Sequence, residues 1–164
     1  MPGLTEIQTM ANQPDHSGVA FPPPFLYVIP LGIGILIHRF HPVALMPREV
    51  AVLLGIPLAV LGIALAAFAM VLFFRARTSP IPIKPTTAIV ETGPYRFTRN
   101  PMYLGMTLLY LGVTLWVDTL WPLLFLPLVI FAVQRFVIAR EERYLEAKFG
   151  ESYRGYKGRV RRWI

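Results

Sequence analysis

The stretch VAVLLGIPLAVLGIALAAFAMVLFF, residues 50–74, decides the fold class of this chain. Its 25 residues carry no charge, and they are followed by Arg75 and Arg77. A helix of about 20 mainly apolar residues crosses the roughly 30 Å of hydrocarbon in a bilayer, and arginines at its end are suited to the headgroup region. The stretch therefore predicts a membrane-spanning helix.

Three further apolar runs predict additional spans. They cover residues 22–41, 102–117 and 119–139, and only the single charge of Asp118 separates the last two. Apolar runs joined by so short a polar break are expected to form a helical hairpin. We predict an all-α integral membrane protein with about four transmembrane helices, preceded by a loosely ordered tail, residues 1–20.

The composition favours one membrane domain over residues 1–164. Hydrophobic residues occupy 55% of the positions, charged residues 15%, and the mean hydropathy is +0.54. The chain is too short for a soluble catalytic domain beside a separate anchor, so any activity has to be built from the spanning helices and their loops. Because there is no cysteine and there are only three histidines, we expect no bound metal.

The distribution of lysine and arginine predicts the orientation. With four spans, the N-terminal tail, the segment 75–101 and the segment 140–164 share one side, and fourteen of the sixteen basic residues lie on it or at its border. The positive-inside rule then predicts a multi-pass protein with both termini in the cytoplasm. The basic tail, residues 156–162, is better explained by orientation and contact with anionic membrane lipids than by RNA binding, so no nucleic acid partner is expected.

The segment 75–101 ends in a motif that favours an anion site. Residues 93–94, Gly-Pro, are typical of a turn, and Asn100 followed by Pro101 is typical of an N-cap and the first position of a helix. The unpaired N–H groups of that first turn can stabilise a carboxylate or a phosphate. Alternatively, Asn100 only caps the helix, while the neighbouring arginines contact lipid headgroups.

The segment 140–164 begins as an amphipathic helix that extends the last span beyond the membrane. Its adjacent Glu141 and Glu142 diverge by about 100° around the helix axis, so they cannot both face one partner. We expect one of them to point inward. The alternative is that Glu141 pairs with Lys148 on a solvated surface, where an ion pair contributes little.

Two sequence blocks carry a resemblance to a known family. GPYRFTRNPMYLG, residues 93–105, is followed some forty residues later by EERYL, residues 141–145, and then by a tail ending in VRRW, residues 160–163. Their order and their positions after apolar spans resemble the isoprenylcysteine carboxyl methyltransferase and phospholipid methyltransferase family of integral membrane enzymes. The resemblance covers residues 86–164.

The resemblance implies methyl transfer from S-adenosyl-L-methionine at the cytoplasmic face. The cofactor's carboxylate would meet helix N–H groups, its ammonium would meet Glu141, and its adenine would meet Tyr95, Tyr103 and Leu145. No Gly-x-Gly-x-Gly motif follows a strand, so a soluble Rossmann-type methyltransferase is not supported. The cofactor contacts implied by the family are Thr87, Ala88, Ile89, Val90, Tyr95, Asn100, Pro101, Met102, Tyr103 and Glu141.

The acceptor is expected to be a lipophilic or amphipathic small molecule that arrives from the bilayer, and the residues do not decide whether oxygen, nitrogen or sulfur takes the methyl group. The prenylcysteine enzymes would have an arginine one turn before the cofactor glutamate, where this chain has Val137. Arg135, Arg140 and Glu142 are the candidates for substrate contact.

Two alternatives remain from the sequence. A membrane sterol-type reductase that uses NADPH shares an Arg-x-x-x-Tyr-x-Gly element, present here at residues 99–105, but such reductases are generally much longer. A non-catalytic membrane scaffold would use the basic face to recruit anionic lipids.

Overall fold

The computed structural model describes residue 18, residues 22–79 and residues 85–164, so the predicted tail lies outside the described residues except for Gly18. The described part of the chain contains helices and no strand, which confirms the all-α class. Its elements are α2 (Pro23–Phe40), α3 (Arg48–Arg75), η1 (Gly93–Arg96), α4 (Pro101–Val117), α5 (Leu120–Ala132), η2 (Val133–Ile138), α6 (Ala139–Phe149) and α7 (Glu151–Arg159).

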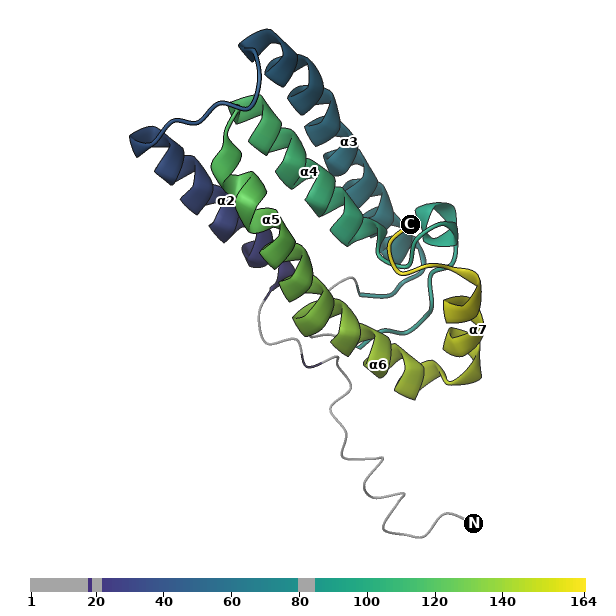
Figure 1. Cartoon of the computed structure of the whole chain (residues 1–164). Coiled ribbons are helices and arrows are strands. Elements are labelled where there is room, and N and C mark those ends of the chain that lie inside the picture. Colours follow the sequence, from purple (N-terminus) through teal and green to yellow (C-terminus); the bar gives the residue numbers. More distant parts are fainter. Residues whose placement is uncertain (1–17, 19–21, 80–84) are drawn as a thin grey trace, which may run out of the picture.

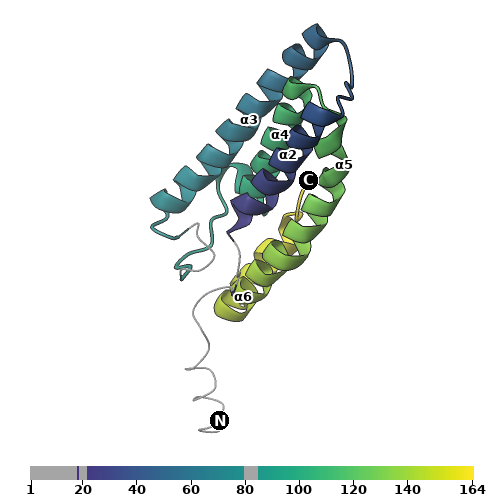
Figure 2. The ribbon, with the colours of Figure 1, turned by 90° about the vertical axis from the view of Figure 1, so that its left-hand side faces the viewer.

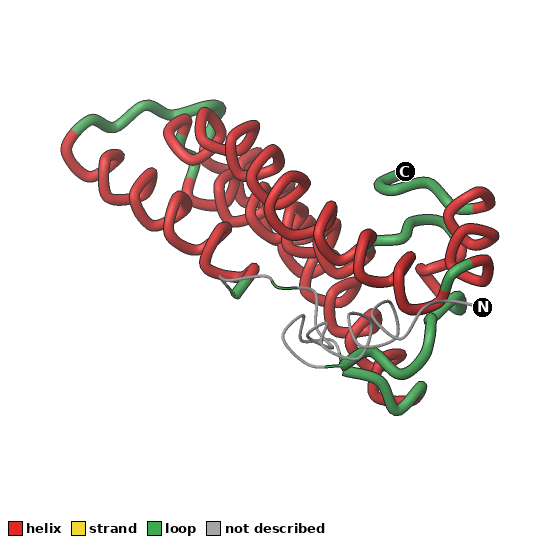
Figure 3. Tube along the Cα trace, turned by 90° about the horizontal axis from the view of Figure 1, so that it is seen from below, coloured by secondary structure: helices red, strands yellow, loops and turns green. Residues whose placement is uncertain are grey.

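The long helices form an elongated bundle whose loops lie at its two ends (Figures 1 and 3). Three of them are long and apolar enough to cross a membrane: α2, α3 and the continuous helix Leu120–Phe149. The fourth apolar helix, α4, has 17 residues, which is about 25 Å at 1.5 Å per residue, and it packs against α3. The prediction of about four spans therefore corresponds to three long helices and one shorter one.

The helix Leu120–Phe149 consists of α5, η2 and α6 and contains 30 residues. A span needs only about 20 residues, so the polar α6 extends beyond the membrane-spanning part, which we take as Leu120–Ile138. Its middle portion, η2, is a π-helix of six residues, in which the adjacent Val137 and Ile138 are both fully buried. Such wider turns inside α-helices are frequent at functional sites.

Helices α3 and α4 approach each other closely along a line of glycines. A Cβ atom added to Gly112 would lie 2.3 Å from the backbone nitrogen of Ala59, and one added to Gly62 would lie 2.4 Å from that of Leu109. Lipid tails are as apolar as the side chains, so membrane helices associate through such close packing rather than through the hydrophobic effect. The glycines thereby fix α4 against α3 (Figure 2).

Asp118 forms the turn between α4 and α5, as predicted for the helical hairpin. It adopts a left-handed backbone conformation, with φ 58°. Its Oδ1 accepts hydrogen bonds from the backbone N–H groups of Leu45 at 2.8 Å and Met46 at 3.2 Å. Asp118 therefore also holds the loop between α2 and α3 at this end of the bundle.

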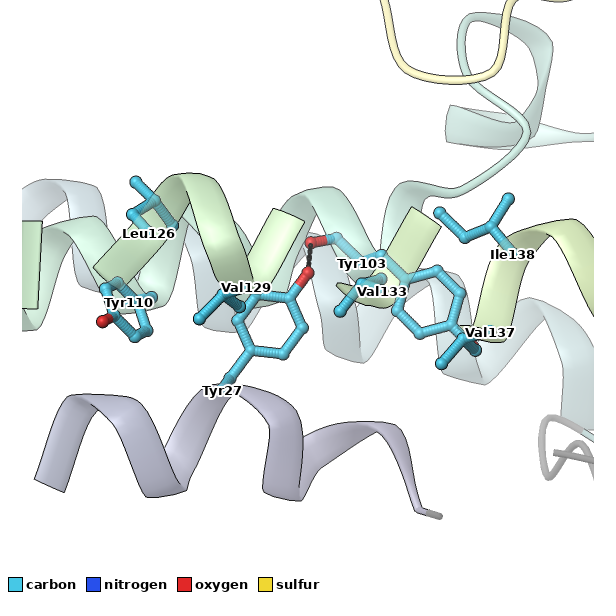
Figure 4. Packing of buried hydrophobic residues seen from close by; sticks show 8 residues of the cluster. All are labelled: Tyr27, Tyr103, Tyr110, Leu126, Val129, Val133, Val137 and Ile138. Carbon is cyan, nitrogen blue, oxygen red and sulfur yellow. Dashed lines mark hydrogen bonds between the residues drawn. The ribbon is translucent and has the colours of Figure 1, made fainter. Parts of the chain in front are cut away.

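Buried tyrosines join α2, α4 and α5 in the core (Figure 4). The Tyr27 hydroxyl donates to the carbonyl of Tyr103 at 3.2 Å, and the Tyr110 hydroxyl donates to the carbonyl of Pro122 at 2.7 Å. Buried polar groups need such partners where water is excluded. The cluster consists of Tyr27, Tyr103, Tyr110, Leu126, Val129, Val133, Val137 and Ile138.

The glycine contact between α3 and α4 gives a test of this packing. We expect Gly112→Ala to lower the free energy of unfolding by about 1–3 kcal/mol, because the added methyl group overlaps the backbone of α3. Gly32→Ala in α2 is the matched control, since nothing lies within 4 Å of its added Cβ. Thermal unfolding in detergent measures both variants, and equal unfolding temperatures would contradict this packing.

Candidate functional site

A cavity lies at the end of the bundle where residue 79 and residues 86–100 meet the start of α4 and one face of α6. It combines apolar and aromatic walls with one carboxyl group and one guanidinium group. The lining residues are Phe73, Ser79, Thr86, Ala88, Val90, Tyr95, Arg99, Asn100, Met102, Tyr103, Glu141, Tyr144 and Leu145.

Glu141 and Tyr103 form one polar side of the cavity. The Tyr103 hydroxyl donates a hydrogen bond to Oε1 of Glu141 at 2.8 Å, which links α4 to α6. Burial raises the pKa of Glu141 to about 7, although the hydrogen bond from Tyr103 acts in the opposite direction, and the charge of Glu142 adds to the rise. Both glutamates face the protein interior rather than only one, with Glu141 directed to Tyr103 and Glu142 directed to two arginines. Near neutral pH, Glu141 can exchange a proton or bind a cation.

Arg99 forms the other polar side. Its Nη2 lies 3.2 Å from Oε1 of Glu142, and both side chains are nearly buried, with 9% and 8% of their surface exposed. The Nε and Nη1 atoms of Arg99 are buried and make no hydrogen bond of good geometry among the described residues, but the hydroxyl of the buried Tyr153 is a hydrogen-bonding neighbour of this guanidinium. Because the guanidinium group of Arg99 lines the cavity, its positive charge favours an anionic ligand there.

The C-terminal segment, residues 159–163, lies across the start of α4. The backbone N–H of Arg99 donates to the carbonyl of Arg161 at 2.9 Å. The side-chain amide of Asn100 donates to the carbonyl of Arg162 at 2.9 Å, and the Thr98 hydroxyl donates to the same carbonyl at 3.1 Å. Asn100 is the N-cap residue of α4 and Pro101 its first residue, as predicted, but the Asn100 side chain makes no capping hydrogen bond, because its amide donates to the tail.

The aromatic wall is held by α7. Tyr95 in η1 packs edge-on against Phe73 at 5.5 Å between ring centroids. The hydroxyl of the buried Tyr156 donates to the carbonyl of Tyr95 at 2.8 Å, and burial raises the pKa of Tyr95 well above its usual value. Tyr95 therefore presents a neutral aromatic ring to the cavity.

The cavity brings together most of the residues predicted to contact a cofactor. Thr87, Ile89 and Pro101 do not line it, and the Thr87 hydroxyl donates instead to the carbonyl of Arg77 at 3.0 Å. Their role as cofactor contacts stays a prediction, as it does for the residues that do line the cavity: Ala88, Val90, Tyr95, Asn100, Met102, Tyr103 and Glu141.

The three candidates for substrate contact lie elsewhere. Arg135 is exposed on η2, and Nη1 of Arg140 donates to the carbonyl of Gly18 at 2.8 Å. Glu142 binds Arg99 and Arg162, so its carboxylate is engaged within the protein. Their role in substrate contact remains a prediction without support from their placement.

The alternative pairing of Glu141 with Lys148 is wrong. Glu141 accepts from Tyr103, whereas Nζ of Lys148 donates to the Tyr144 hydroxyl at 3.1 Å. The spacing of residues 141, 144 and 145 on one helix face predicts that Tyr144 and Leu145 accompany Glu141. No comparable sequence signal indicates that Phe73, Ser79 or Thr86 line the cavity, because they come from other elements.

The sequence model of the phospholipid methyltransferase family matches residues 50–152, well over half of the chain. The chain belongs to this family. The resemblance predicted from the two sequence blocks is confirmed, and the matched range contains both Tyr103 and Glu141. The C-terminal segment, residues 159–163, lies beyond the residues that match the phospholipid methyltransferase family.

A curated relative covers a smaller part of the chain. It is an uncharacterized protein of Haemophilus influenzae, 48% identical over 63 residues, which are 38% of this chain and the whole of that protein. Membership of the family implies a membrane methyltransferase that acts on lipid-type substrates. The three long apolar helices agree with a membrane location.

The raised pKa of Glu141 predicts a pH dependence of stability. The carboxyl group titrates near 7 in the folded protein and near its ordinary value of 4.5 when unfolded, so the folded form binds the proton more tightly. This tighter proton binding by Glu141 stabilises the folded protein fully below about pH 4.5, and the stabilisation is lost as the pH rises through 7. We expect the unfolding temperature of the ligand-free protein to fall, relative to that of Glu141→Gln, between about pH 5 and pH 8.

Thermal unfolding in detergent across this pH range measures the effect. The matched control is Glu151→Gln, which removes a carboxylate with 87% of its side chain exposed, and it should follow the wild type. Parallel curves for the wild type and Glu141→Gln would show that Glu141 does not titrate in this range.

Proposed function

We propose that the protein transfers a methyl group from S-adenosyl-L-methionine to a lipophilic or amphipathic acceptor that reaches the cavity from the bilayer. One observation carries the proposal. The cavity places a carboxyl group, Glu141, and a guanidinium group, Arg99, at the end of a bundle of apolar helices.

The residues of the cavity fit the groups of this cofactor. Its ammonium matches the Glu141 carboxylate, and its carboxylate matches the guanidinium group of Arg99. Its sulfonium and adenine match an aromatic and apolar wall that includes Phe73, Tyr95 and Leu145. This donor set supports a zwitterionic amino-acid group, which NADPH does not have.

The protein's task in such a reaction is mainly alignment. Bound S-adenosylmethionine supplies a methyl group on a good leaving group, so a nucleophilic side chain is unnecessary. Tyr103 orients the Glu141 carboxylate, Arg99 holds the anionic end, and the apolar wall excludes water. Holding the donor in one orientation beside the acceptor lowers the entropic part of the barrier.

We place the cavity on the cytoplasmic side of the membrane. The described parts of the basic segments, residues 75–79, 85–101 and 140–164, belong to the end of the bundle where the cavity lies (Figure 1). The positive-inside rule assigns this end to the cytoplasm, where the methyl donor would be available, with both termini on the same side. The acceptor would reach the cavity along the helices from the lipid.

Titration calorimetry of the detergent-purified protein tests the choice of cofactor. We expect micromolar binding of S-adenosylhomocysteine and no binding of NADPH, because only the former carries an ammonium and a carboxylate. Glu141→Gln should weaken the binding by about ten-fold or more, since a charge-assisted hydrogen bond is lost. The matched control, Glu151→Gln, should bind like the wild type. Binding of NADPH instead would favour the reductase, and binding of neither ligand would favour the scaffold.

The hydrogen bond between Tyr103 and Glu141 gives a second test. We expect Tyr103→Phe to weaken S-adenosylhomocysteine binding about three- to ten-fold, because the ring remains but the hydroxyl that orients the carboxylate is lost. In a Glu141→Gln background the same substitution should have a smaller effect, since the two residues act as a unit. Additive losses in the double variant would contradict this coupling.

A further inference from the structure

The two arginines that share Glu142 bind it in different ways. Arg162 donates from Nε to Oε1 at 3.0 Å and from Nη2 to Oε2 at 2.5 Å, so it engages both carboxylate oxygens. Arg99 reaches Oε1 only through Nη2. Two-point contact is the preferred pairing of a guanidinium with a carboxylate, and Arg162 occupies it. Arg99 therefore has only a one-point contact with Glu142, and its guanidinium group also lines the cavity.

We infer that Arg162, on the C-terminal segment, is a positioning residue that keeps the guanidinium group of Arg99 in place for the carboxylate of the cofactor. The inference rests on the proposed function and assigns Glu142 to the same task. Glu142 then holds Arg99 in place rather than contacting a ligand itself. Arg162 lies outside the residues matched by the family, which end at residue 152.

The backbone of the C-terminal segment is fixed independently of the ion pairs. The carbonyl of Arg162 accepts from both Thr98 and Asn100, the two residues that flank Arg99. The indole N–H of Trp163 donates to Oε1 of Gln134 at 3.1 Å, which ties the tail to the last span. The side chain of Arg162 thus projects from a segment that is already seated beside Arg99.

The charges in this cluster favour an anion in the cavity. One nearly buried carboxylate faces two guanidinium groups, so the Arg99–Glu142–Arg162 cluster keeps one unit of positive charge. If Arg162 is removed, Glu142 has one cationic partner left, and a nearly buried carboxylate without full compensation is unfavourable. Arg99 is then expected to turn both of its outer nitrogens toward Glu142 and to withdraw its donors from the cavity.

The test compares two ligands that differ only in a carboxylate. S-adenosylhomocysteine carries it, and S-adenosyl-3-thiopropylamine, its decarboxylated form, keeps the adenosine, the thioether and the ammonium. We expect Arg162→Gln to weaken binding of S-adenosylhomocysteine about ten-fold, the usual effect of losing one charge-assisted contact, and to leave binding of the amine within about two-fold. Titration calorimetry in detergent measures both affinities.

Two further variants sharpen the comparison. Arg159→Gln is the matched control, because it removes an arginine of the same segment that pairs with Glu91 at the surface, and it should bind both ligands like the wild type. Arg162→Lys keeps the charge but cannot make the two-point contact, so it should also lose most of the preference for the carboxylate. It serves in place of Arg162→Gln should that variant not fold.

The outcomes separate this inference from the proposed function. Absence of S-adenosylhomocysteine binding by the wild-type protein defeats the proposed function itself. If the wild type binds it, equal losses for the two ligands in Arg162→Gln would assign Arg162 a general structural role and overturn the inference. Unchanged binding of S-adenosylhomocysteine, or wild-type behaviour of Arg162→Lys, would overturn it as well.

Discussion

The Glu142 carboxylate is the contact on which the cavity end of the molecule depends. From α6, it binds the guanidinium groups of Arg99, just before α4, and of Arg162, in the C-terminal segment. Because Glu142 and Arg99 are nearly buried, neither charge is tolerated without the other. The ion cluster of Arg99, Glu142 and Arg162 lies beside the cavity. It holds together the parts of the chain around the cavity, so the shape of the cavity depends on this cluster.

The helix bundle supplies the rigid frame for that cluster. The glycines of α3 and α4 bring two backbones into contact, and the buried tyrosines join α4 to α2 and α5. These contacts fix the position of Tyr103 along the bundle, so that its hydroxyl donates a hydrogen bond to Glu141. The Glu141 carboxylate, oriented by Tyr103 of α4, and the Arg99 guanidinium then line the same cavity. This arrangement suits a ligand that carries charges of both signs.

The sequence predicted the fold because membrane spans depend mainly on length and composition. The uncharged run 50–74 and the single charge of Asp118 were sufficient to indicate α3 and the hairpin. The two sequence blocks identified the family and most of the residues that line the cavity. That Glu141 faces Tyr103 while Glu142 faces two arginines depends on the exact rotation of α6, which hydropathy leaves open.

Long-range contacts account for what the sequence could not predict. Whether the amide of Asn100 accepts from its own helix or donates to another segment depends on the position of the Arg162 carbonyl, 62 residues away. The sharing of Glu142 by two arginines is likewise a property of the folded tail. The π-helix η2 has a further consequence, because one residue corresponds to about 100° of helix rotation. Removing a single residue there would turn Glu141 away from α4, so this junction is expected to tolerate changes of side chain far better than changes of length.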